Sequence, residues 1–296
     1  MLIPQSTPAK NSFVPMLVLG LLLLDGLHFV WARILHEYLP PMASVSWYFI
    51  IATLEIGGFA WWQGKLRWQT FRRLWWFFLT IGVCIAISTT TNYIAVGYID
   101  PGIGTLLTQS IIVYNLAFGV IWFKDRLTRP QIIGAVLCII GILIISFQPG
   151  DYLRVGTLMV LSSTLLYSLH AALVKRFGND MEFIDFFTWR IASTTLWAML
   201  ATTALGQWQW PSGVAWLWLL AAATFDIAIS RALYYLALRR LSISLHTLTL
   251  TLSPVMAALW SFLLFSIYPS PRQMIGGLAI LAGIAVVSLA RRAHST

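Results

Sequence analysis

The sequence predicts an all-α membrane protein with ten transmembrane helices in two inverted five-helix repeats. Three observations support this prediction: too little charge for a soluble domain, ten apolar segments of spanning length, and an internal repeat. Hydrophobic residues make up 59% of the 296 residues and charged residues only 10%, whereas an ordinary globular domain carries roughly 25% charged residues. A chain this poor in charge could not cover its surface in water.

Ten segments have the length of about 20 apolar residues that a helix needs to cross a bilayer. They lie near 13–35, 42–62, 74–97, 102–122, 130–147, 154–175, 184–205, 214–236, 243–266 and 272–290. The connections are short, and several contain the turn-forming residues proline and glycine. The first apolar run is too long for a signal peptide. We therefore expect one membrane domain, with residues 1–147 and 148–296 as its two halves.

Basic residues predict the orientation, because cytoplasmic loops carry an excess of Lys and Arg. Of the 19 basic residues, 14 fall in the terminal segments and in the loops that follow even-numbered spans. Arg33, Arg154 and Arg272 lie on the other side, and Arg190 and Arg231 lie within spans. We expect a multi-pass protein of the bacterial inner membrane with both termini in the cytoplasm. The net charge of +9 then reflects topology rather than nucleic-acid binding.

The two halves align without a gap when the chain is shifted by 142 residues against itself. Matched pairs include His28 with His170, Trp47 with Trp189, Ser88 with Ser230, Gln131 with Gln273, and Gly141 with Gly283. Each repeat has an odd number of spans, so the second copy enters the membrane from the opposite side. Inverted repeats of this kind place a substrate site near the midplane and work by alternating access.

Motifs in both halves resemble a known family. The first half has Tyr93-Ile-Ala, the turn Lys124-Asp125-Arg126, then Gln131-Ile-Ile-Gly and Gly141; the second half has Tyr235-Leu-Ala, Gln273-Met-Ile-Gly and Gly283. This pattern resembles the EamA-type branch of the drug/metabolite transporter superfamily, and Trp189-Arg190 is similar to an aromatic-Arg element of its seventh helix. The turn acid is Asp125 rather than the usual Glu, and Ile267 replaces it in the second half.

The resemblance implies an exporter of small metabolites. In its abundance of Trp, Tyr and Phe the chain resembles the aromatic amino-acid exporter subgroup of this family. Amino acids, aromatic ones included, are therefore the first expected substrates. Drugs or nucleobases on the same fold, and a facilitator or channel, are the alternatives. We expect no cofactor and no metal, and a membrane-embedded enzyme is disfavoured because catalytic motifs are absent from the sequence. The expected partners are a small-molecule substrate and the lipid bilayer, not nucleic acid, for a monomer or weak homodimer.

Ionisable residues at membrane depth are costly and usually face a cavity. Asp25, Glu55 and Asp226 lie about a dozen residues from the nearer loop, which places them near the middle of the bilayer. They are candidates for proton coupling or for binding a substrate amine, and neutral hydrogen-bonded carboxyls are the alternative. Arg190 and Arg231 lie closer to helix ends, where snorkelling to the interface competes with contact to a substrate carboxylate.

Other polar and aromatic residues complete the candidate site. The candidate substrate-binding residues are His28, Asn92, Gln109, Tyr167, His170, Trp189, Tyr234 and Thr251. For each of them, interhelical hydrogen bonding or core packing is the competing role. Pro254 removes a backbone donor within the ninth span and predicts a hinge. Glycines in the fifth and tenth spans predict close helix packing, which could extend to a dimer contact.

Overall fold

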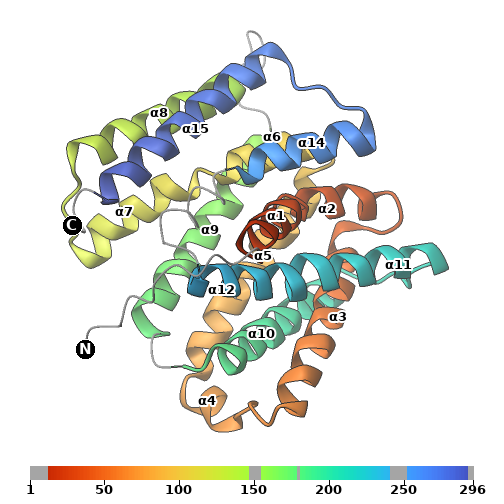
Figure 1. Cartoon of the computed structure of the whole chain (residues 1–296). Helices are drawn as coiled ribbons and strands as arrows, with labels where there is room; N and C mark the ends of the chain where they lie inside the picture. The colour runs from red at the N-terminus through yellow and green to blue at the C-terminus, as the bar shows by residue number, and fades with distance from the viewer. Residues whose placement is uncertain (1–12, 147–154, 179–180, 241–251, 293–296) are drawn as a thin grey trace.

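The computed structural model describes residues 13–146, 155–178, 181–240 and 252–292, and within these ranges every regular element is helical (Figure 1). Eight spans are long and apolar enough to cross a membrane, and the shorter apolar helix α14 (Ser253–Phe265) belongs to a ninth. The remaining span is α10 (Phe183–Ala204), which has 22 residues but carries Asp185, Arg190 and five threonines. The elements follow the order of the ten predicted segments, which confirms the predicted fold class.

Each half supplies five spans. The first half contains α1 (Phe13–Asp25) with α2 (His28–His36), α3 (Pro41–Trp62), α5 (Trp75–Ala95), α6 (Pro101–Thr108) with α7 (Ile111–Phe123), and α8 (Arg129–Ser146). The short helix α4 (Trp68–Arg73) connects α3 to α5. The second half contains α9 (Val155–Phe177), α10, α11 (Gly213–Ala222) with η1 (Ala223–Ile229) and α12 (Ser230–Arg240), α14, and α15 (Pro271–Arg292). Several of these helices begin at proline, whose missing N–H needs no partner in a first turn.

Backbone details repeat with the offset predicted from the sequence. Among the described residues, the four with positive φ form two pairs: Lys124 (55°) with Ser266 (53°), and Gly64 (64°) with Gly206 (63°). Lys124 and Ser266 are left-handed C-caps of α7 and α14. In each pair the residues are 142 apart. The local conformation at the ends of the spans therefore repeats along with the sequence.

Side-chain contacts repeat in the same way. The Trp47 indole donates to the Gln209 carbonyl at 3.0 Å, and its repeat mate Trp189 donates to the Arg67 carbonyl at 3.1 Å. Arg67 and Gln209 are themselves repeat mates. Both indoles pack against neighbouring tryptophans, so that one aromatic cluster forms at each end of the helices. Amphipathic rings favour these positions at the membrane–water interface.

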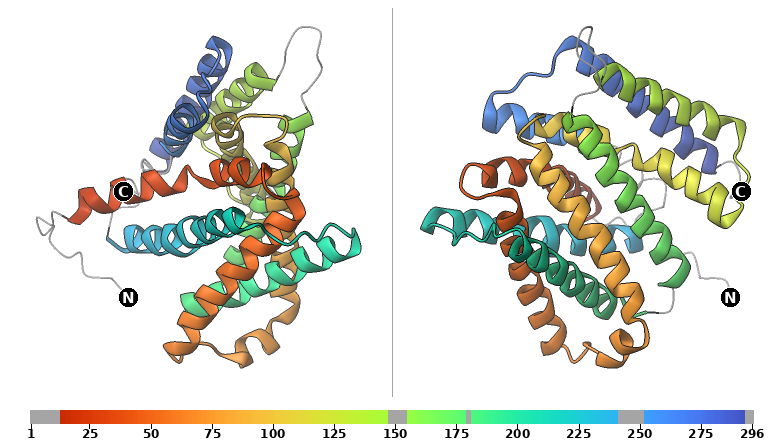
Figure 2. Two further views of the ribbon diagram at one scale, coloured as in Figure 1. Left: turned by 90° about the vertical axis from the view of Figure 1, so that its right-hand side faces the viewer. Right: turned by 180° about the vertical axis from the view of Figure 1, so that it is seen from behind.

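The helix contacts have the symmetry of an inverted repeat. The helix α3 packs against its repeat mate α10, and α8 packs against its repeat mate α15. The fourth and ninth spans are also mates, and between them α6 packs against α14. The contact of α1 with α12 is the repeat image of the contact of α9 with α5. Figure 2 shows α8 and α15 lying side by side in both views. The largest buried apolar cluster draws side chains from α2, α3, α5, α10 and α11. The two halves therefore share one core.

Glycines bring α8 and α15 into backbone contact. A Cβ atom on Gly134 would lie 2.5 Å from the Gly283 carbonyl oxygen, and one on Gly141 would lie 2.5 Å from the Gly276 carbonyl oxygen. These two contacts are images of each other under the repeat. The predicted small-residue packing is confirmed, and it joins two helices of one chain.

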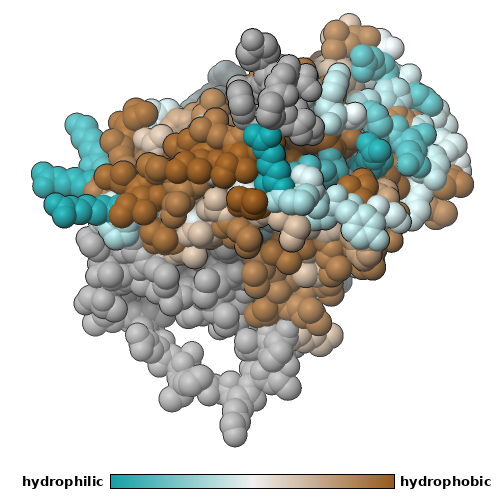
Figure 3. Space-filling model, turned by 90° about the horizontal axis from the view of Figure 1, so that it is seen from above, coloured by the Kyte–Doolittle hydropathy of each residue, from teal (hydrophilic) through white to brown (hydrophobic). Residues whose placement is uncertain are grey.

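The outer surface of these helices is apolar. Figure 3 looks onto the α8–α15 side and shows large hydrophobic areas, with hydrophilic side chains gathered toward both ends of the face. The exposed apolar residues of α8 and α15 are Ile132, Ile133, Val136, Ile139, Ile140, Leu143, Met274, Ile275 and Leu278. Such a surface suits contact with lipid chains, and the protein is therefore a multi-pass membrane protein.

Candidate functional site

A central cavity of about 370 Å³ is lined by residues of both halves. Its size falls in the range of roughly 300–1,000 Å³ that is typical of small-molecule sites. Four charged side chains line it, Asp25, Arg190, Asp226 and Arg231. The aromatic lining residues are Phe29, Tyr48, Phe49, Tyr167, Phe187 and Tyr234, together with the imidazole of His28. The cavity therefore combines both signs of charge with several rings.

Irregular backbone converges on this cavity. The first span breaks between α1 and α2, where Asp25 and His28 flank the break, and the fourth breaks at Gln109 between α6 and α7. The eighth span contains the π-helical segment η1, which carries Asp226. All four residues line the cavity. At membrane depth, broken helices are tolerated where they line a cavity, because the freed backbone groups need polar partners.

The break in the first span has a steric cause at Gly26. A Cβ atom there would lie 2.9 Å from the backbone nitrogen of Ala257 and 3.0 Å from the carbonyl oxygen of Ser253. The first turn of α14 therefore passes directly over the break. This crossing places the Ser253 hydroxyl beside Asp25, whose carboxylate accepts a hydrogen bond from it.

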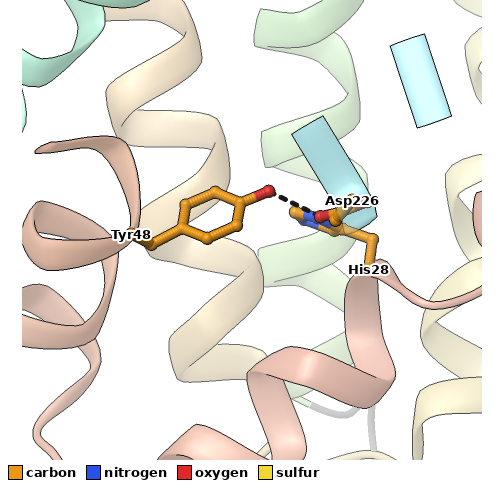
Figure 4. Close-up of polar contacts among 3 residues, drawn as sticks. All are labelled: His28, Tyr48 and Asp226. Atoms are coloured by element: carbon orange, nitrogen blue, oxygen red, sulfur yellow. Dashed lines mark hydrogen bonds and ion pairs between the residues drawn. The ribbon is translucent and has the colours of Figure 1, made fainter. Parts of the chain in front are cut away.

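The π-helical segment η1 aims Asp226 at two donors (Figure 4). The Tyr48 hydroxyl of α3 donates to Asp226 Oδ2 at 2.5 Å, and His28 Nδ1 of α2 lies 2.8 Å from the same oxygen. Single π-turns inside α-helices occur frequently at functional sites. Here the turn joins α2, α3 and the eighth span in one polar cluster, made of His28, Tyr48 and Asp226.

Both arginines that the sequence places within spans line the cavity. Arg231 interacts electrostatically with Asp25 and Asp226. Arg190 and Arg231 both interact electrostatically with Tyr167. Arg190 also lies over the Phe187 ring, with its guanidinium carbon 5.5 Å from the ring centroid. Because both guanidinium groups line the cavity, each of them is accessible to a bound substrate.

A second wall of the cavity is polar but largely satisfied within the protein. Ser163 of α9 donates to Asn92 Oδ1 of α5 at 2.5 Å, and Ser88 donates to the Ser163 carbonyl at 2.9 Å. The Thr105 and Thr108 hydroxyls donate to carbonyls of their own helix. This wall fixes α5 against α9 and presents amide and hydroxyl groups to the cavity.

The cavity brings together most of the predicted site residues. Those that line it are His28, Asn92, Gln109, Tyr167 and Tyr234, together with the acids Asp25 and Asp226. Thr251 lies outside the described residues. Pro254 lies in the first turn of α14, where its missing N–H breaks no helical bond; its hinge role stays a prediction.

Three predicted residues do not line the cavity. His170 is buried with its ring 5.3 Å from that of Tyr167. Trp189 lies in the aromatic cluster near Arg67, at an end of the helices. Glu55 accepts a hydrogen bond from Thr224 at 2.7 Å, between α3 and η1. Their positions fit the packing and interhelical hydrogen-bonding roles that were the alternatives.

Tyr48 is the polar member of the cluster with His28 and Asp226 that sequence reasoning missed, and the lining rings of Phe29, Phe49 and Phe187 were missed as well. A signal was available, because the repeat pairs Tyr48 with Arg190 and Asp25 with Tyr167. Both members of each pair line the cavity. The symmetry is nevertheless broken in chemistry, since the mate of Asp226 is Cys84. The repeat mates of His28, Tyr48 and Asp226 are His170, Arg190 and Cys84, so this cluster has no chemical equivalent under the repeat.

The comparisons with known proteins agree with this architecture. A sequence model of the EamA-like transporter family matches residues 12–147 and, a second time, residues 154–289. The chain belongs to the EamA-like transporter family. Membership makes it a membrane transporter and accounts for the two copies of one unit.

Relatives of this family member extend the comparison. An "Uncharacterized transporter YdfC" of Bacillus subtilis (strain 168) is 22% identical over 63% of this chain and 62% of its own length. A "UPF0060 membrane protein" of Nocardia farcinica (strain IFM 10152) is 34% identical over 36% of this chain but 95% of its own length. A solved structure titled "Crystal structure of protein" superposes with a TM-score of 0.65 at 17% identity, over 97% of this chain and 100% of that one. The last match shows a shared fold.

Proposed function

We propose that this transporter exports small metabolites, with amino acids, aromatic ones included, as its first substrates. The observation that carries the proposal is the cavity lining, in which two carboxylates and two guanidiniums accompany several aromatic rings. A free amino acid carries one charge of each sign, and ionised groups form the strongest hydrogen bonds. A purely apolar drug would make no polar contact with these groups in exchange for the water that it displaces, which is costly in a low-dielectric site.

Each end of an amino acid has a matching group in the cavity. Arg190 is the candidate for the substrate carboxylate, because a guanidinium binds carboxylates through two parallel hydrogen bonds. Asp25 and Asp226 are the candidates for the ammonium group. The rings of Phe29 and Phe49 are apolar surface for a side chain. Gln109, at the break between α6 and α7, adds an amide for orientation.

We propose alternating access as the mechanism, since inverted repeats can exchange their conformations on the two sides of one fixed site. The protein would act as a monomer or weak homodimer, without nucleic acid. Nucleobases or drugs as substrates, and a facilitator or channel, are the alternatives that the transport assay below distinguishes.

The proposed location is the bacterial inner membrane with both termini in the cytoplasm. This follows from the positive-inside rule. In a variant without native cysteines, a cysteine at exposed Ser212 should react in intact cells with a membrane-impermeant maleimide. A cysteine at exposed Arg72 should react only after permeabilisation. The reverse labelling pattern would invert the topology.

The function is tested by uptake of labelled phenylalanine or tryptophan into proteoliposomes, with and without unlabelled substrate inside. Saturable uptake that preloading stimulates is expected of a carrier. Unsaturated flux that ignores preloading would support a channel. Uptake of a nucleobase but of no amino acid would support the alternative substrate class.

Arg190 provides the specific variant for the same assay. Arg190→Gln should raise the KM for phenylalanine at least about tenfold, since a hydrogen bond to a charged group contributes roughly 1.5–3 kcal/mol. The matched control is Arg176→Gln, an exposed arginine beyond the cavity that should leave the KM unchanged. An unchanged KM in Arg190→Gln would remove this residue from the substrate site.

A further inference from the structure

His28 is the accessible member of a buried pair. Its side chain is 29% exposed, while that of Asp226 is 6% exposed. Both side chains line the cavity, and the imidazole is the more exposed of the two. Nδ1 faces Asp226 Oδ2 at 2.8 Å. This leaves Nε2, which has no hydrogen bond to the described residues, as the ring atom that can exchange a proton with the cavity.

The surroundings of His28 contain few other groups that titrate. Tyr93 of α5 packs against the ring at 5.9 Å, and Tyr48 of α3 shares Asp226 with it. Asp25 of α1 interacts with it electrostatically, and Arg231 of α12 faces both acids. The other helices packed against α2, which are α6, α11 and α14, carry no titratable side chain. Histidine is thus the one group here whose side-chain type ordinarily changes charge between roughly pH 5 and 8.

We propose that His28 is the proton-binding site of this carrier and that it couples export to proton entry. In the neutral state, the Nδ1 proton lies in the hydrogen bond to Asp226. A proton from the cavity then forms a new bond at Nε2, and the ring becomes an imidazolium paired with the carboxylate. No other bond breaks, and release reverses the step. This inference rests on the proposed function.

The coupling follows from a shared counter-charge. Arg231 interacts with both Asp25 and Asp226, so this one cation balances only one of the two carboxylate charges. Asp226, which lies against His28, is the carboxylate placed to compensate an added positive charge there. It can compensate an imidazolium or a substrate ammonium, but binding both together leaves one cation uncompensated in a low-dielectric site. Proton and amino acid therefore exclude each other. A carrier that reorients with one or the other bound exchanges them across the membrane.

The broken symmetry leaves one copy of this site and no equivalent at the positions related by the repeat. The repeat mate of His28 is His170, which lies buried outside the cavity. The mate of Asp226 is Cys84, which supplies no carboxylate. These positions therefore have no counter-charge to offer an imidazolium.

The test separates exchange from coupling in proteoliposomes. Wild type should accumulate labelled phenylalanine when the lumen is made one pH unit more acidic than the medium, with the membrane potential clamped at zero. The limit for one-to-one exchange is about tenfold, since one pH unit is a tenfold ratio of proton activity. His28→Gln should lose this accumulation when accumulation is compared with the variant's own rate of exchange of labelled for unlabelled phenylalanine. The matched control His36→Gln changes an exposed histidine of the same helix and should behave as wild type.

Vesicles loaded with a pH-sensitive dye make the test independent of how any variant folds. Adding phenylalanine to wild-type vesicles should move protons out of the lumen. Exchange without proton movement in wild type would overturn this inference and leave the proposed function standing. Accumulation retained in His28→Gln would overturn it as well. Absence of amino-acid exchange in wild type would overturn the proposed function, and this inference with it.

Discussion

The crossing of α8 and α15 gives a quantitative prediction, because two backbones touch there without side chains between them. We consider Gly141→Ala. Its Cβ would lie 2.5 Å from the Gly276 carbonyl oxygen and 2.7 Å from the Ile280 side chain. Ordinary contact begins at 3.4 Å, so α15 must retreat by about 0.9 Å at this point. The same two helices are also in backbone contact where Gly134 meets Gly283, and this second contact opposes the movement of α15.

The expected cost follows from overpacking, which destabilises a folded protein by roughly 1–3 kcal/mol. Alanine also has a higher helix propensity than glycine, by about 1 kcal/mol. A matched control cancels this gain. Gly58 lies within α3, and a Cβ atom there has nothing within 4 Å. We therefore expect Gly141→Ala to be less stable than Gly58→Ala by about 1–3 kcal/mol.

The assay is thermal unfolding of the purified protein in detergent, followed by the loss of the monodisperse peak in size-exclusion chromatography. Gly141→Ala should lose the peak at a lower temperature than wild type, and Gly58→Ala should match or exceed wild type. Equal stability of the two variants would refute the backbone contact between α8 and α15.

Two further predictions concern hydrogen bonds at membrane depth. Tyr48→Phe removes the 2.5 Å donor to Asp226 and should lower stability by about 1.5–3 kcal/mol if that carboxyl is ionised, or by about 0.5–1.5 kcal/mol if it is neutral; no loss at all would contradict the contact. Thr53 and Thr195 are repeat mates whose hydroxyls lie 2.7 Å apart, so a double-mutant cycle to alanine should give a coupling energy of about 0.6 kcal/mol, the average for such bonds in membranes. Strictly additive single mutants would show that the two hydroxyls do not interact.

The sequence alone determined the number of spans, their order and the inverted repeat. These properties depend on hydrophobic length and on a constant offset, which are local or linear features of a chain. The lipid environment simplifies the prediction, because every backbone group in the bilayer must be satisfied within a helix. The cost of charge in lipid also allowed ionisable residues such as Asp25 and Asp226 to be assigned to a cavity from their depth along a span.

The tertiary structure decided which polar residues meet. Periodicity gives the face of a helix but not its neighbour, so Tyr48 was missed, and Glu55 and Trp189 were included although they lie outside the cavity. The tertiary structure also decided where the helices are irregular, namely at the breaks in the first and fourth spans and in the π-helical segment around Asp226. They depend on contacts with distant helices, such as α14 over Gly26. A polar group's role follows from its partners, and a partner can lie far away in the sequence, as in the pair His28 and Asp226, which are 198 residues apart.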